Sequence, residues 1–308
     1  MSILQQIKNG PVQRPPKIML IGVEGVGKST AGANMPNPLF ICGESGLVGP
    51  QFQDVPNFTP ESWKDVLDLC DELAQNPGNY RSLVIDTLDW LEPMLYAHVV
   101  TAAHKSDIKH IEDFGYGKGY VMAQTEARQL LSRLDRVNAA GLNILILSHS
   151  QLKTVQNPTG ENYDHFESKV NQKIAGVFKE WCDCVLFAHF EVYVEKNKMG
   201  INKATGGDER IVQTTHSAAW DAKNRYGLPE VMPLDMVAIM EAITAGQVDV
   251  EALKKEFAGY IKGMKPEVAK KAKEWLEGGK WTVQQLAQKV NSYRVKQNIN
   301  IEEKKEAE

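Results

Sequence analysis

The chain has 308 residues, of which 43% are hydrophobic and 24% charged, and its formal net charge is −4 at pH 7. These values are typical of globular proteins and exclude a disordered or fibrous chain. Because the molecule is not a polycation, any contact with nucleic acid must come from local basic patches. No apolar run approaches the roughly 18 residues of a membrane span, and four cysteines are too few for a disulfide framework. We therefore expect a cytoplasmic protein that does not bind a membrane.

Short apolar runs alternate with helical patterns over much of the chain. Strands are predicted at residues 17–21, 39–42, 83–86, 143–147 and 185–188, and helices at residues 29–35, 60–75 and 121–140. Such an alternation is typical of an α/β fold in which helices cover both faces of a mostly parallel sheet. The first 16 residues contain three prolines and predict an irregular arm.

The pattern changes after residue 188. Polar and apolar residues alternate over residues 191–215 around Gly206-Gly207, which predicts a β-hairpin with a long tip. The remaining sequence is helical in pattern, and residues 251–308 contain 13 Lys and Arg against 9 Asp and Glu. We therefore divide the chain into an irregular arm (1–16), an α/β core with a C-terminal hairpin (17–235) and a helical, basic C-terminal region (236–308).

Residues 22–30 fit the pattern G-x-x-x-x-G-K-[ST] and stand between a predicted strand and a predicted helix, the context that a phosphate-binding loop needs. Backbone N–H groups of such a loop converge on phosphate oxygens, while Lys28 would reach the β- and γ-phosphates and Ser29 would bind Mg²⁺. The alternative is a glycine-rich turn with an incidental lysine. We predict a site for ATP and Mg²⁺, although no pattern distinguishes ATP from GTP. The residues expected to hold the nucleotide are Gly22, Gly25, Gly27, Lys28, Ser29 and Thr30.

Polar residues at the ends of three other predicted strands complete the expected site, since ligands collect at the carboxyl ends of parallel strands. Asp86 is expected to hold Mg²⁺ together with Ser29, unless it only caps the next helix. Glu44 is expected to position or deprotonate the attacking water, unless it is a solvated loop residue. His149 or Gln151 is expected to sense the γ-phosphate, unless the histidine is a satisfied buried residue.

Several of these segments together resemble the RecA/RadA-type ATPase core. They are residues 22–30, 40–44, 83–86 and 144–151. A sharper likeness is Lys223-Asn-Arg225-Tyr-Gly227, which is similar to the Lys-Asn-Arg-Phe-Gly motif of bacterial RadA proteins. Within that group the chain resembles phage-encoded ATP-binding proteins of the RecA-like single-strand annealing group, the fourth Sak class, through residues 111–120 and 221–229. The resemblance covers residues 15–235 and departs from the pattern at Thr87.

The resemblance implies a RecA-like P-loop NTPase fold and an ATPase that binds single-stranded DNA and promotes annealing or strand exchange. It also implies head-to-tail assembly into a ring or filament, in the host cell cytoplasm if the protein is phage-encoded. A single-strand-binding protein is a further candidate partner. Lys223 and Arg225 would then enter the neighbouring subunit's site and stabilise transition-state charge, as an arginine finger does. The alternative is a solvated basic turn before Pro229.

Two segments combine lysines with aromatic residues, as single-stranded DNA sites do when bases stack on rings and lysines follow the phosphates. One is the long connection over residues 151–173, with its turn at residues 157–160, and the other is the hairpin tip over residues 195–210. Ordinary solvated loops are the alternative. The candidate DNA contacts are Lys153, Tyr163, Phe166, Lys169, Lys173, Lys196, Lys198 and Lys203.

The sequence and the resemblance together predict a Mg²⁺-dependent ATPase that is stimulated by DNA and works in phage homologous recombination. Two other classes stay open. One is a nucleotide-gated factor for helicase loading or another step of DNA replication, and the other is a small-molecule phosphotransferase. Stimulation of hydrolysis by single-stranded DNA would distinguish the predicted recombination ATPase from a phosphotransferase.

Overall fold

The computed structural model describes residues 14–43, 47–196, 202–247, 250–264 and 266–279, together with the pairs 285–286, 289–290 and 292–293. The chain forms two compact units, which divide between Met240 and Glu241. The expected boundary after residue 235 lies close to this division, at the start of helix α6 (Met236–Gln247). No helix within the described ranges is long and apolar enough to cross a membrane.

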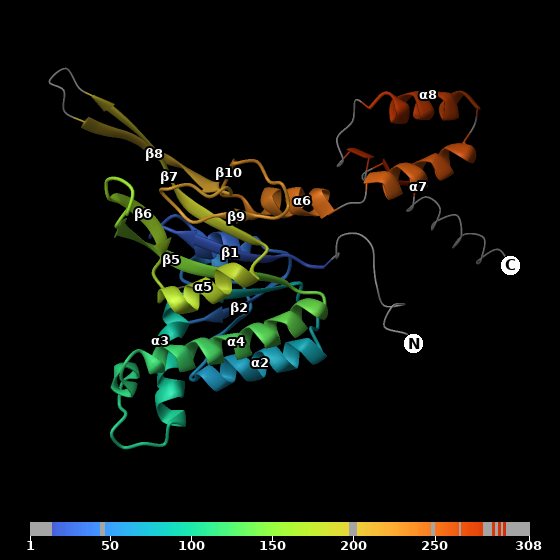
Figure 1. Cartoon of the computed structure of the whole chain (residues 1–308). Coiled ribbons are helices and arrows are strands. Elements are labelled where there is room, and N and C mark those ends of the chain that lie inside the picture. Colours follow the sequence, from blue (N-terminus) through green and yellow to red (C-terminus); the bar gives the residue numbers. More distant parts are fainter. Residues whose placement is uncertain are drawn as a thin grey trace. The chain divides into compact units, whose positions relative to one another are not determined.

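The first unit is built on a sheet whose strands lie in the order β10-β8-β7-β1-β5-β4-β2-β3 (Figure 1). In the central part β1 pairs with β5 and β7, and β4 pairs with β5 and β2, all in parallel. The strands β6, β8, β9 and β10 pair antiparallel with their neighbours. The predicted α/β fold with a mostly parallel sheet is thus confirmed. The strands are β1 (Lys17–Gly22), β2 (Pro38–Cys42), β3 (Asn57–Phe58), β4 (Ser82–Asp86), β5 (Asn143–Val155), β6 (Tyr163–Ser168), β7 (Cys184–Lys196), β8 (Asn202–Gln213), β9 (Lys223–Asn224) and β10 (Val231–Pro233).

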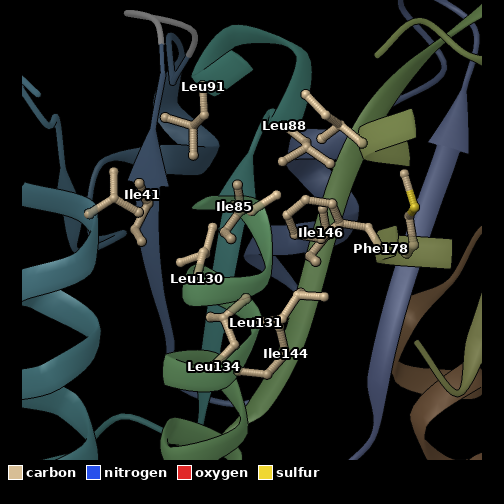
Figure 2. Packing of buried hydrophobic residues seen from close by; sticks show 14 of the residues in the cluster. Ile41, Ile85, Leu88, Leu91, Leu130, Leu131, Leu134, Ile144, Ile146 and Phe178 are labelled. Atoms are coloured by element: carbon tan, nitrogen blue, oxygen red, sulfur yellow. The ribbon is translucent and has the colours of Figure 1, made fainter. Parts of the chain in front are cut away.

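Helices cover both faces of the sheet, so the central strands are apolar where they are covered, as at residues 144–147 of β5. The helices of this unit before α6 are α1 (Lys28–Ala33), α2 (Trp63–Gln75), α3 (Leu88–Ala102), α4 (Lys118–Ala139) and α5 (Gln172–Trp181), with the 3₁₀ helices η2 (Pro50–Phe52) and η3 (Ile111–Phe114). Figure 2 shows leucines of α3 and α4 packed on isoleucines of β2, β4 and β5. On the other face, a Cβ atom on Gly32 of α1 would lie 2.9 Å from the Phe40 ring and 3.0 Å from Val84. Glycine therefore lets α1 approach the sheet closely.

Helix α3 was not among the predicted helices, because Pro93 interrupts its pattern and its apolar residues do not keep to one side. Helix α2 begins later than predicted, at Trp63. Its start is fixed by a capping box, in which the Ser62 hydroxyl accepts the Asp65 N–H and the Asp65 carboxylate accepts the Ser62 N–H.

The expected long connection over residues 151–173 is not an irregular loop. Strand β5 runs on to Val155 and pairs antiparallel with β6, so this segment is a β-hairpin, and α5 begins at Gln172. The hairpin predicted over residues 191–215 is confirmed by the pairing of β7 with β8. Lys196 pairs with Asn202, so Gly206-Gly207 lies within β8 and not at the tip of the hairpin. Gly206 instead pairs with Val192 beside an irregularity in the register, with a φ of 90°.

The second unit contains the helices α7 (Val250–Lys262) and α8 (Pro266–Glu277). Its own small core includes Leu253, Phe257, Leu286 and Val290, and the Lys289 ammonium lies 4.4 Å from the centre of the Trp275 ring. Helix α7 thus contributes buried residues to this core, whereas α8 packs against it with partly buried residues such as Trp275 and Leu276.

Candidate nucleotide-binding site

The predicted phosphate loop connects the carboxyl end of β1 to α1. Gly25 and Gly27 have φ angles of 72° and 100°, a backbone region that favours glycine. A Cβ atom on Gly22 would lie only 3.0 Å from the Ala188 carbonyl oxygen of β7. The glycines of the pattern therefore allow the backbone conformation of the loop and its close packing on β7. They are also expected to let the loop N–H groups approach phosphate oxygens.

Lys28 is buried, with 6% of its surface exposed. Its ammonium donates to the carbonyl oxygens of Gly22 (3.1 Å) and Val23 (3.0 Å) at the base of the loop. A lysine held in this way lies under the loop, where phosphate oxygens could take the place of these carbonyls as acceptors. The geometry fits the predicted role of Lys28.

A hollow of about 220 Å³ brings the predicted groups together. It is lined by Gly25, Gly27, Lys28, Ser29, Thr30, Phe52, Asp86, Thr87 and His149. The topology explains this meeting, because β5 lies between β1 and β4 and all three strands end at the same edge of the sheet. Lys28 and Asp86, which are far apart in sequence, therefore face one cavity.

Oxygen atoms for a magnesium ion are present in this hollow. Asp86 is buried, Ser29 is half-buried, and the buried hydroxyl of Thr87 makes no hydrogen bond with any described residue. Carboxylate and hydroxyl oxygens suit Mg²⁺, which usually keeps several waters besides one or two carboxylates and the substrate's phosphates. Ser29 and Asp86 thus fit the predicted role of metal ligands. Thr87, where the sequence departs from the RecA/RadA pattern, places a further hydroxyl oxygen in the same hollow.

His149 at the end of β5 is fixed by Asp89 of the first turn of α3. The Asp89 carboxylate contacts the ring Nδ1 (2.7 Å) and accepts the backbone N–H of His149 (2.9 Å). Burial works to raise the pKa of Asp89, but the hydrogen bonds and the charge of His149 outweigh it and hold that pKa below its usual value. With Nδ1 engaged, the ring presents its other nitrogen for a contact elsewhere. Asp89 is not among the residues predicted from the sequence, and only its place beside β5 reveals this contact.

A second hollow, of about 440 Å³, shares His149 with the first. Glu24 of the phosphate loop contributes to it, and so does Lys169. The remaining lining residues come from α3, namely Asp89, Trp90, Glu92 and Pro93. His149 therefore stands at the junction between the phosphate hollow and a polar cavity next to it.

Two other predicted site residues lie elsewhere. Glu44 is outside the described residues, so its role as the water-positioning carboxylate stays a prediction. Gln151 does not line the phosphate hollow, and its amide donates to Glu167 (3.2 Å) across the β5–β6 hairpin. Of the two sensor candidates, His149 lines the phosphate hollow and Gln151 does not.

Lys223 and Arg225 lie at the opposite edge of the sheet from the phosphate loop of their own chain. Strand β9 pairs with the first residues of β7, and the Arg225 guanidinium contacts Asp183 (3.3 Å), which also accepts the backbone N–H of Lys17 at the start of β1. The Lys223 ammonium donates to three carbonyls at the end of α5, those of Lys179, Glu180 and Cys182. Lys223 thus bonds to the end of α5 in its own subunit, whereas the Arg225 side chain is 54% exposed.

The candidate DNA-binding residues differ in their exposure and in their contacts with other side chains. Lys153, Tyr163, Lys169 and Lys173 are exposed, and Lys153 forms an ion pair with Glu167 (3.3 Å). The ring of Phe166 stacks on Phe187 with centroids 5.1 Å apart, so that face is not open to a base. Lys196 and Lys203 belong to β7 and β8, but their side chains are not described, and Lys198 lies outside the described residues.

Comparison with known proteins adds one finding. A family model described as an AAA domain matches residues 14–226, which is more than half of the chain and includes every strand from β1 to β9. No curated protein matches the chain.

Proposed function

Because the chain belongs to the AAA domain family of P-loop ATPases, we propose that it is a Mg²⁺-dependent ATP hydrolase that binds single-stranded DNA and promotes annealing or strand exchange in phage recombination. The observation that carries the nucleotide part is the hollow in which Lys28, Asp86 and His149 meet. The DNA part and the RecA-like affiliation rest on the resemblance and on where the two hairpins lie.

The residues of the hollow divide the work of phosphoryl transfer among them. Lys28 and the loop amides bind the phosphates, and Ser29 and Asp86 hold the metal, which when bound neutralises phosphate charge. Glu44 positions the attacking water. His149, oriented by Asp89, contacts the γ-phosphate through the ring nitrogen that Asp89 leaves available and is sensitive to its loss.

The link from nucleotide to DNA runs through β5. Just past the phosphate hollow, the His149 carbonyl accepts the N–H of Lys169 (2.8 Å). Beyond His149 the strand continues into the β5–β6 hairpin, which carries Lys153 and Tyr163, and this hairpin and the β7–β8 hairpin extend from the same side of the unit (Figure 1). A shift of His149 on loss of the γ-phosphate would move the DNA-binding side chains and change the affinity for DNA.

The proposal includes a head-to-tail homo-oligomer in which Arg225 completes a neighbour's site. Its exposure and its distance from the phosphate loop of its own chain support a role in trans rather than in cis. A mixture of Lys28→Ala and Arg225→Ala subunits tests this, because each variant would lack a different half of a shared site. The mixture should hydrolyse ATP although neither variant does so alone, and absence of any recovery would contradict a shared site.

The direct test of the function is phosphate release with and without single-stranded DNA. Wild type should be stimulated by the DNA, and Lys28→Ala should show no turnover in either condition. DNA binding should weaken steeply as salt rises from low to physiological concentration, because several phosphates are contacted. Hydrolysis indifferent to DNA, together with DNA affinity indifferent to salt, would reject the DNA part and leave a plain ATPase.

The second hollow favours one other candidate, a small-molecule phosphotransferase. Its polar lining and its contact with His149 would suit an acceptor hydroxyl, with the His149–Asp89 pair as proton acceptor. The two functions differ in the fate of the γ-phosphate. A phosphotransferase would release little phosphate from ATP in water and would transfer it to an added acceptor, whereas the proposed hydrolase releases one phosphate for each ATP consumed.

A further inference from the structure

Arg210 of β8 reaches the phosphate loop of its own chain. A Cβ atom on Gly27 would lie 2.9 Å from the Nη1 atom of Arg210, so the guanidinium lies directly against the loop. The sheet accounts for this position. Gly22 pairs with Ala188 of β7, and Phe190, two residues further along β7, pairs with Arg210.

The backbone of Arg210 is held firmly at this point. Its carbonyl accepts the N–H of Leu234 (2.9 Å), and β8 is paired on one side with β7 and on the other with β10. The side chain therefore extends from an ordered strand, which reduces the entropy lost when a ligand fixes its position.

Arg210 lacks the kind of partner that other arginines of the unit have. Arg225 and Arg14 pair with Asp183, and Arg133 pairs with Asp71. Within the part of the chain that the structure describes, the Arg210 guanidinium makes no ion pair or hydrogen bond. Lys28 and Arg210 thus bring two positive charges to the same short loop from different elements, an arrangement that a bound anion would stabilise.

We propose that Arg210 binds the phosphate chain of the nucleotide in the same subunit. The inference rests on the proposed nucleotide site and adds a second cation to it. A guanidinium offers several N–H donors in a planar fork that matches two phosphate oxygens, which a lysine cannot reproduce. Because Arg210 belongs to β8, the bound nucleotide would also be tied directly to the β7–β8 hairpin.

The experiment measures binding of ATP and of ADP to Arg210→Ala, Arg210→Lys and wild type by calorimetry in the presence of Mg²⁺. Loss of a charged hydrogen bond should weaken nucleotide binding by about tenfold to a hundredfold in the alanine variant, with part of the affinity restored in the lysine variant. Asp208→Ala, a change of an exposed residue on the same strand, is the matched control and should bind as wild type does. Thermal unfolding of each variant checks that it is folded.

Three outcomes decide the matter. If Arg210→Ala binds nucleotide as tightly as wild type, the inference is overturned while the nucleotide site stands. If wild type itself binds neither nucleotide, the proposed function fails first. If mixing Arg210→Ala with Lys28→Ala subunits restores hydrolysis, Arg210 acts in trans and the assignment to its own subunit is wrong, because a group acting in cis leaves both kinds of site incomplete.

Discussion

The two edges of the parallel sheet each gather basic residues, but these residues have different neighbours. At the carboxyl edge, Lys28 follows a glycine-rich loop beside a hollow, and the guanidinium of Arg210 from β8 lies against that loop. At the opposite edge, the Lys223 ammonium donates hydrogen bonds to three carbonyls at the end of α5, and Arg225 contacts the buried Asp183. Comparison of Lys28 with Lys223 teaches that the surroundings of a cation, more than its sequence pattern, indicate whether it serves a ligand or the fold, while the exposed Arg225 keeps its proposed role in a neighbouring site.

The largest expected difference between the two edges is in catalysis. Lys28→Ala should lower kcat/KM for ATP roughly a hundredfold or more, because a charged donor to the transferring phosphate is lost. Thermal unfolding checks that the variant is folded, since Lys28 also donates to two carbonyls of the loop. Phosphate release at saturating and limiting ATP measures the effect. Nearly normal turnover of Lys28→Ala would contradict the role of the phosphate loop in hydrolysis.

The opposite edge should respond in stability. Lys223→Met should lower the free energy of unfolding by about 1–3 kcal/mol, because three carbonyls at the end of α5 lose a charged donor. Arg225→Met, with a largely exposed side chain, should lower it by about 1 kcal/mol at most. Urea unfolding compares the pair. Equal stabilities for the two variants would mean that the contacts of Lys223 do not fix α5.

Thr87→Val separates ligand binding from stability within the phosphate hollow. The buried Thr87 hydroxyl has no partner among the described residues, so its removal should leave the nucleotide-free protein as stable as before or more stable by about 1 kcal/mol. Binding of ATP with Mg²⁺ should nevertheless weaken. A variant that loses stability but keeps its affinity would show that the hydroxyl serves the fold instead.

The smallest expected effect is a pH dependence at Asp89. Its pKa in the folded chain lies below the usual 3.8, so the ionised carboxylate stabilises the fold above that pH and loses this contribution as the pH falls through the folded value. The stability gap between wild type and Asp89→Asn should therefore narrow in acid as the pH falls below 3.8. Asp107→Asn, at an exposed position, is the control, and a gap that widens in acid would contradict the assignment.

The sequence predicted the phosphate loop and the meeting of Lys28 with Asp86, because a local pattern and parallel strand ends suffice for both. It could not reveal that Asp89 contacts His149 or that Arg210 lies against Gly27. Asp89 matters only because β4 and β5 are neighbours, and Arg210 only because the register of β7 with β8 carries it to Gly27. Helices α3 and α5 were likewise missed, since burial against the sheet stabilises them despite Pro93 and the short length of α5.

The central claim is that the hollow between Lys28 and Asp86 binds a magnesium-bound triphosphate. Calorimetric titration of ATP into wild type and Asp86→Asn, each with and without Mg²⁺, tests it most directly. We predict one site per chain in wild type with affinity raised by Mg²⁺, and an Asp86→Asn variant in which Mg²⁺ no longer raises it. Absence of ATP binding to wild type, or an effect of Mg²⁺ that survives in Asp86→Asn, would contradict the claim.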